Sequence, residues 1–133
     1  MTIRFTPARA ATVGLAAAGL LALAGCGGSS ESAGTAPTGV DVEVRALNGI
    51  AWNAKSYTAT ATDGKITIFA ANDSSLPHNL HVLDKDGNDV AKAIDLPSAG
   101  SSGTEDVEIT PGEYRIVCQI PGHTNMDSTL TVS

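Results

Sequence analysis

From residue 40 to the C-terminus, apolar and polar residues alternate in short runs, which is the pattern of half-buried β-strands. Val40, Val42 and Val44 alternate with charged residues, which gives this segment one apolar side and one solvent-facing side. Similar runs cover residues 57–61, 65–72, 78–82, 105–110, 114–118 and 126–132, and residues 91–96 fit either a short helix or a poor strand. About seven to eight short strands separated by turn residues predict an all-β fold, a Greek-key β-sandwich.

Two turns between these runs carry further predictions. Thr62, Asp63 and Gly64 are typical hairpin residues, so we expect a hairpin that joins residues 57–61 to residues 65–72. Pro111 and Gly112 make the turn into Tyr114. We expect the Tyr114 hydroxyl to donate a hydrogen bond back to the backbone, as in a tyrosine corner.

Residues 1–39 lack the alternation. Arg4 and Arg9 precede the uncharged residues 10–24, and a basic start followed by a short apolar run predicts an export signal over residues 1–25. The apolar run is shorter than the roughly 20 residues that a membrane-spanning helix needs. Residues 26–39 are mostly small and polar, which predicts a flexible tether. A single domain then covers residues 40–133.

The export signal ends in Leu23-Ala24-Gly25-Cys26, which is similar to a bacterial lipoprotein box. This resemblance implies that Cys26 becomes the acylated first residue of the mature protein, with palmitate among its acyl chains. Two or more acyl chains hold a protein on a membrane surface without crossing it. We therefore expect the protein in the cell envelope, lipid-anchored to the extracytoplasmic face of a bacterial membrane. The alternative is an ordinary secretory signal with an incidental cysteine.

The second cysteine of the chain, Cys118, is the centre of a candidate metal site. If Cys26 carries lipid, Cys118 has no disulfide partner in an oxidising compartment, and metal ligation would occupy its thiol. His123 and Met126 follow in the same short loop. A thiolate, an imidazole and a thioether are soft or borderline donors that select copper over hard cations. We therefore predict a site for one copper ion; the alternative is a buried, inert cysteine.

A blue-copper site needs two histidines, one cysteine and a weak axial methionine, so a second histidine has to come from elsewhere in the chain. The candidates are His78 and His81. His78 shares strand parity with Leu80 and Val82, so its ring should point inward, whereas His81 has the opposite parity and should face solvent. The same parity argument points two later sets of residues inward: Tyr114, Ile116 and Cys118, and Met126, Ser128, Leu130 and Val132.

The order of these motifs resembles the cupredoxins, the family of plastocyanin and azurin. The motifs are Pro77-His78-Asn79 at a strand start, the turn that leads into Tyr114, and Cys118-Gln119-Ile120-Pro121-Gly122-His123. The resemblance covers residues 40–133. It implies a type 1 copper ion held by His78, Cys118 and His123 as strong ligands and by Met126 as the weak axial ligand. One departure is that only Thr124 and Asn125 separate His123 from Met126, where family loops have three or four residues.

The resemblance also assigns roles around the metal. Asn79 would brace the cysteine loop through a hydrogen bond. His123 would present its ring edge at the surface for electron transfer, among apolar residues such as Leu76 and Pro121. Related copper enzymes carry a histidine beside the ligand cysteine or a second cysteine in this loop, and here the neighbours of Cys118 are Val117 and Gln119. The resemblance therefore implies an electron carrier and not an enzyme.

Charge narrows the range of partners. Removing residues 1–25 leaves six basic against fourteen acidic residues, a net charge of −8. Such a chain is not suited to nucleic acid. Glu105, Asp106 and Glu108 could steer a basic redox protein, or they could simply keep the surface soluble. We expect a monomer that meets unidentified protein redox partners at the membrane.

Three functions from different classes fit the sequence. The first is one-electron transfer by a membrane-anchored type 1 copper protein. The second is extracytoplasmic copper binding and delivery, in which the metal is cargo. The third is a metal-free sandwich with a role in adhesion or envelope structure. The complete set of four candidate ligands favours the first.

Overall fold

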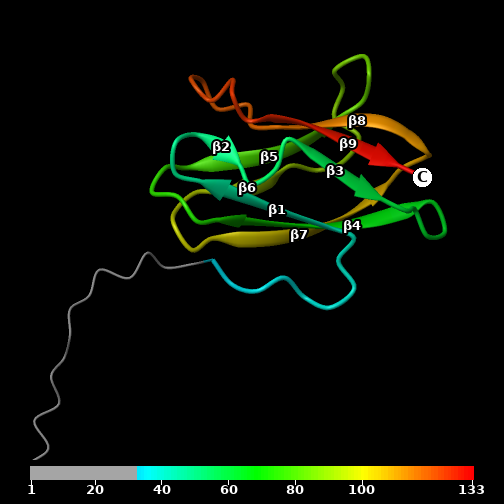
Figure 1. Cartoon of the computed structure of the whole chain (residues 1–133), viewed down its shortest axis with the longest axis horizontal. Coiled ribbons are helices and arrows are strands. Elements are labelled where there is room, and N and C mark those ends of the chain that lie inside the picture. The colour runs from blue at the N-terminus through cyan, green and yellow to red at the C-terminus, as the bar shows by residue number, and fades with distance from the viewer. Residues whose placement is uncertain (1–32) are drawn as a thin grey trace, which may run out of the picture.

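The computed structural model describes residues 33–133, which form nine β-strands in two sheets (Figure 1). This confirms the all-β sandwich, with slightly more strands than expected. The bounds are β1 Val42–Leu47, β2 Ala51–Trp52, β3 Ser56–Ala59, β4 Lys65–Asn72, β5 His78–Leu83, β6 Ile94–Leu96, β7 Ser102–Glu108, β8 Gly112–Val117 and β9 Asp127–Val132.

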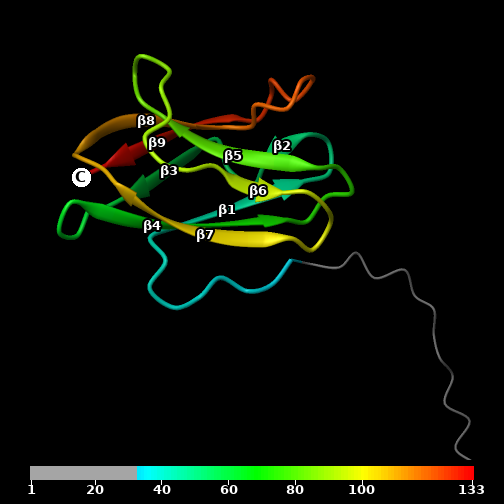
Figure 2. The same ribbon diagram turned by 180° about the vertical axis from the view of Figure 1, so that it is seen from behind.

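The sandwich has a four-stranded sheet in the order β2-β1-β4-β7 and a five-stranded sheet in the order β3-β9-β8-β5-β6. Two opposite views show the sheets as stacked layers (Figures 1 and 2). β1 runs parallel to β4, and β3 runs parallel to β9, while the other neighbouring strands are antiparallel. Residues 91–96, for which helix and strand were both open, contain the edge strand β6.

Apolar residues from alternate positions of both sheets fill the space between the layers. Val44 and Ile68 of the first sheet and Ile116 and Leu130 of the second are completely buried. Small aliphatic side chains stand in for the aromatic residues that the sequence largely lacks. Because successive side chains of a strand point to opposite faces, this burial confirms the parity predicted from the sequence.

The predicted hairpin around Asp63 is wrong. Asp63 and Gly64 have positive φ angles of 51° and 74°, as a tight turn requires, and Thr62 and Lys65 exchange both backbone hydrogen bonds. Beyond that one bridge the strands separate, because β3 pairs with β9 in one sheet and β4 pairs with β1 and β7 in the other. The turn therefore connects the two layers of the sandwich.

The tyrosine corner is present at the start of β8. The Tyr114 hydroxyl donates to the carbonyl oxygen of Thr110 at 2.9 Å. This bond fixes the bend through which the chain enters the strand that ends next to Cys118. The role of Tyr114 is structural.

Residues 33–40, which we call the strap, lie along the outer face of the four-stranded sheet. Ala33 is buried together with Phe69 and Ala71 of β4. The Arg45 guanidinium donates to the carbonyl oxygens of Ala33 and Gly34, both at 2.9 Å, and forms an ion pair with Asp73. The hydrogen bonds from Arg45 to Asp73 raise the arginine pKa above its usual range. The last part of the predicted tether is thus packed against the domain.

We expect Arg45→Ala to release the strap. The change removes charge-assisted hydrogen bonds and an ion pair that is only partly exposed, so the free energy of unfolding should fall by about 1–3 kcal/mol. Hydrogen–deuterium exchange of residues 33–40 should speed up at the same time. Lys65→Ala is the control, because Lys65 makes only an exposed pair with Glu108 and should change stability by about 0.5 kcal/mol or less. Unchanged exchange of the strap in Arg45→Ala would contradict this role.

The predicted signal over residues 1–25, the lipidated Cys26 and the tether residues 26–32 lie outside the described residues. Over residues 33–133 no helix is long and apolar enough to cross a membrane.

Candidate metal centre

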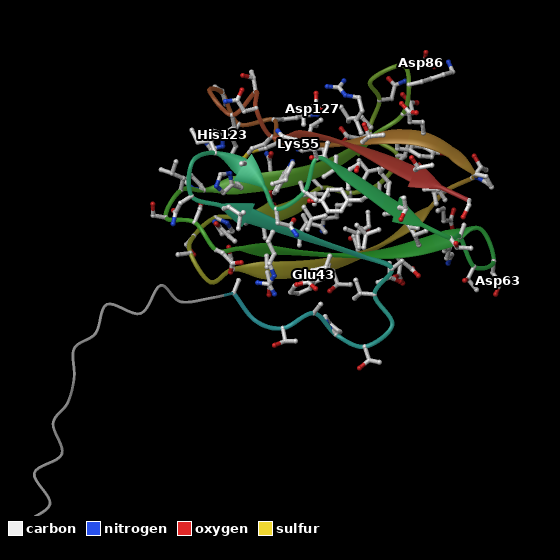
Figure 3. All side chains as sticks on the ribbon, viewed as in Figure 1. Glu43, Lys55, Asp63, Asp86, His123 and Asp127 are labelled. Carbon is white, nitrogen blue, oxygen red and sulfur yellow. The ribbon has the colours of Figure 1, made fainter. Side chains whose placement is uncertain are left out.

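Two neighbouring strands bring the predicted ligands to one end of the sandwich. His78 is the first residue of β5, and Cys118 directly follows β8. The two strands are antiparallel neighbours, with His81 opposite Val117, so the start of one lies beside the end of the other. Figure 3 shows His123 at the end of the sandwich opposite Asp63.

The ligand loop consists of two consecutive tight turns. In the first, the His123 amide donates to the carbonyl oxygen of Ile120 at 3.0 Å, and Gly122 has the positive φ of 88° that the third residue of a type II turn requires. Pro121 supplies the fixed φ of the second residue. In the second turn, the Met126 amide donates to the carbonyl oxygen of His123 at 2.9 Å. The residues from His123 to Met126 therefore form a single tight turn, which accounts for the short spacing between these two residues.

Both ends of this loop are held by hydrogen bonds. The Cys118 amide donates to the carbonyl oxygen of Met126 at 3.0 Å, which closes the loop at its base. Asn79 Oδ1 accepts from the Gln119 amide at 2.8 Å, the brace that the family resemblance implied. Lys55 donates to the carbonyl oxygen of Asn125 at 3.2 Å on the outer side. The loop conformation is thus set by the protein itself.

The candidate ligand atoms of three residues lie close together. The candidate ligand atoms of His78, Cys118 and His123 all lie within 4.8 Å of one another, and all three residues are buried. Cys118 Sγ is 3.6 Å from His123 Nδ1, and the two imidazole rings are 4.8 Å apart between centroids. This is the only such cluster of histidine, cysteine or carboxylate groups over residues 33–133.

The state of His78 suits metal binding. Its Nδ1 is buried without a hydrogen-bond partner among the described residues, and a buried nitrogen of that kind costs free energy unless something binds it. Burial lowers the pKa of His78, and the neighbouring His123 lowers it further. The ring is therefore held neutral, the form that ligates metals.

Met126 adds a fourth donor. It is 1% exposed, and it borders the same small surface hollow as Cys118 and Thr124. A thiolate, a thioether and two imidazoles are soft or borderline donors, which suit copper. The set contains none of the oxygen donors that calcium or magnesium prefers. The four residues thus have the chemistry of a blue-copper site.

His81 lies outside this site. Its Nδ1 is 2.7 Å from Asp89 Oδ1 on the far side of β5, in keeping with the outward direction predicted from parity. Two residues near His78 were missed by sequence reasoning. The Trp52 ring lies 6.3 Å from the His78 ring between centroids, and Ser74 Oγ lies 2.7 Å from His78 Nε2. Neither belongs to a spacing pattern that points to the site.

Solved structures with a similar fold have been found, although neither a protein-family model nor a curated protein sequence matches the chain. Reduced auracyanin from Roseiflexus castenholzii has a TM-score of 0.60 and 21% identity over 69% of this chain and 95% of its own. Auracyanin A, a "blue" copper protein from Chloroflexus aurantiacus, has a TM-score of 0.58 and 18% identity over 68% and 96%. An azurin from Methylomonas sp. strain J has a TM-score of 0.57 and 14% identity over 71% and 98%. The chain has the cupredoxin fold.

Proposed function

We propose that this cupredoxin-fold protein is a type 1 copper protein that carries one electron at a time. The observation that carries the proposal is the buried convergence of His78, Cys118 and His123 within 4.8 Å, with Met126 in the same loop. Copper bound there would supply a one-electron Cu(II)/Cu(I) couple. Similar solved structures include a protein described as a "blue" copper protein, which supports the choice of metal.

A carrier needs a site that changes little when the electron arrives. Here hydrogen bonds within the protein hold the backbone of the ligand loop: the Cys118 amide donates to the Met126 carbonyl oxygen, and Asn79 accepts from the Gln119 amide. His78 is fixed separately, at the start of β5. Donors held by strands and tight turns cannot rearrange freely, so the free energy needed to reorganise the site on electron transfer is small.

The same donor set argues against substrate chemistry. With two imidazoles, a thiolate and a thioether as ligands, the protein would fill the coordination positions of the metal and leave none for a substrate. A catalytic metal site usually keeps such a position open. Val117 and Gln119, which flank Cys118, offer no imidazole for a second metal. We therefore propose a carrier without enzymatic activity.

Electrons would pass at the end of the sandwich where His123 lies. His123 is 7% exposed, while Leu76, two residues before His78, is 42% exposed. Pro77 and Pro121 beside the two histidine ligands are exposed as well. An apolar surface close to a buried metal lets a partner protein dock closely without desolvating charges. Acidic positions such as Asp106 and Glu108 could add long-range steering of a basic partner.

The second part of the proposal concerns the membrane. The strap begins at Ala33, whose amide donates at 2.8 Å to Asp73, next to Ser74 and close to His78. The chain therefore enters the domain at the metal end. An acylated Cys26, seven residues before Ala33, would keep that end within roughly 25 Å of the membrane surface. The redox partner is then a protein held in or on the same membrane, and the protein works as a monomer.

A potentiometric titration separates electron transfer from copper delivery. For a carrier, we expect the bound metal to be reduced and reoxidised reversibly, in a one-electron step, over repeated cycles without loss of copper. A delivery protein would release copper in one oxidation state or to a chelator of moderate affinity. Irreversible or absent cycling, or loss of metal on reduction, would contradict the carrier proposal and favour delivery.

A further inference from the structure

A buried polar network contacts Nε2 of the His78 ring. Ser74 Oγ lies 2.7 Å from His78 Nε2. Ser74 is in turn held by Asn72, whose Oδ1 accepts from the Ser74 amide at 2.9 Å. Asn72 is fully buried, and Ser74 and His78 are each 2% exposed, so water does not satisfy these groups.

Counting donors and acceptors favours one arrangement of the protons in this network. The Ser74 hydroxyl donates to the carbonyl oxygen of Leu76 at 3.2 Å, and it accepts from the Leu76 amide at 3.2 Å. A hydroxyl has one proton and two lone pairs. With its proton given to Leu76, its remaining lone pair accepts a proton from His78 Nε2. In this arrangement the ring carries its proton on Nε2.

The opposite tautomer makes one hydrogen bond fewer. If Ser74 donated its proton to a bare Nε2, the carbonyl oxygen of Leu76 would lose a donor, and only Asn72 Nδ2 at 2.8 Å would remain. The ring proton would then sit on Nδ1, which is buried and has no hydrogen-bond partner among the described residues. Nδ1 lacks a hydrogen-bond partner in either tautomer, so the two differ in the bond from Ser74 to Leu76, which only the Nε2-protonated form keeps.

We propose that Ser74 is a positioning residue that selects the Nε2-protonated tautomer of His78, so that the bare Nδ1 faces Cys118 and His123 before metal binds. The inference deepens the proposed copper function, on which its purpose rests. The protonation state itself is a property of the apoprotein. Residues behind a ligating histidine commonly fix its tautomer and orientation, and their loss typically weakens metal affinity by about 10–100-fold.

The direct test is the tautomer of His78 in the metal-free protein. The protein is labelled with ¹⁵N-histidine and kept free of metal with a chelator, and two-bond ¹H–¹⁵N correlation spectra are recorded near pH 7. We expect His78 to be a single Nε2-protonated species in the wild type and in Ser74→Thr, which keeps the hydroxyl. Ser74→Ala should give a mixture of tautomers. A wild-type His78 protonated on Nδ1 would overturn the proposal, whether or not any variant folds.

Copper affinity supplies the second readout. Competition with a chelator should show about 10–100-fold weaker copper binding for Ser74→Ala and recovery in Ser74→Thr. Ser75→Ala is the matched control, because its exposed side chain makes no hydrogen bond to the described part of the chain. Equal affinity of Ser74→Ala and Ser75→Ala, with an unchanged tautomer, would overturn the role of Ser74. If the wild type binds no copper, the proposed function fails while the spectra still decide the tautomer.

Discussion

Replacing Cys118 by serine is expected to abolish the intense visible absorption that copper gives the wild-type protein. The absorption of a blue-copper site requires a bond between copper and a thiolate, and Cys118 is the one cysteine of the described chain. A serine hydroxyl stays protonated near neutral pH and does not replace the thiolate. The measurement is the visible spectrum during titration of the purified protein with Cu(II).

The fold should survive this change, because serine is close to cysteine in size and the loop is closed by backbone bonds. Circular dichroism should therefore remain that of a β-protein. Thr124→Ala is the matched control in the same loop, since Thr124 is exposed and offers no metal ligand in our account. It should keep the full absorption. A Cys118→Ser protein with wild-type colour would show that the thiolate is not a ligand.

Replacing Cys26 by serine is expected to remove the acyl chains and leave the copper site intact. Each buried methylene of an acyl chain contributes about 0.8 kcal/mol to membrane binding, so losing two or more chains eliminates stable anchoring. The measurement is incorporation of a labelled palmitate analogue in a bacterial host that processes lipoproteins. We expect labelling of the wild type and none of Cys26→Ser.

The two cysteine variants control each other. Cys118→Ser should lose the colour and keep the lipid label, whereas Cys26→Ser should lose the label and keep the colour. A wild-type protein without label would remove the lipid anchor from the account and leave the copper centre untouched. Labelled Cys26→Ser would place the lipid on another residue.

Much of the site could be predicted from the sequence because strand parity is a strict geometric rule. Buried apolar residues recur at every second position of β5, at Leu80 and Val82, and this parity predicts that His78 points inward and His81 outward. Both rings lie in the predicted directions. β8 ends just before the inward Cys118. Since β5 and β8 are antiparallel neighbours, the two inward positions meet at one end.

Other features depend on long-range contacts that a local pattern does not contain. The residues around Asp63 specify a tight turn but not which strands pair after it, so the hairpin prediction failed when the two strands joined different sheets. The strap resembles a tether in composition, yet Ala33 is held through Arg45 and Asp73, which lie far along the chain. Small polar composition alone does not distinguish these two cases.

The network behind His78 could not be predicted for a different reason. Asn72 is the last residue of β4, but Ser74 lies in the irregular segment between β4 and β5, where polar residues are ordinary and no period assigns a direction. Only the three-dimensional structure shows that Ser74 is buried beside the imidazole and that Asn72 holds Ser74 in place. The effect of the short spacing between His123 and Met126 could not be predicted either, because it depends on the geometry of the turn.

The most direct test of the central claim is a copper titration of the purified wild-type protein, followed by metal analysis and the visible spectrum. The account predicts one copper ion per chain, held against a weak chelator, with an intense visible band that saturates at that ratio. If the protein does not bind copper stoichiometrically, or binds it without the intense visible band, the claim that His78, Cys118, His123 and Met126 hold a single copper ion is contradicted.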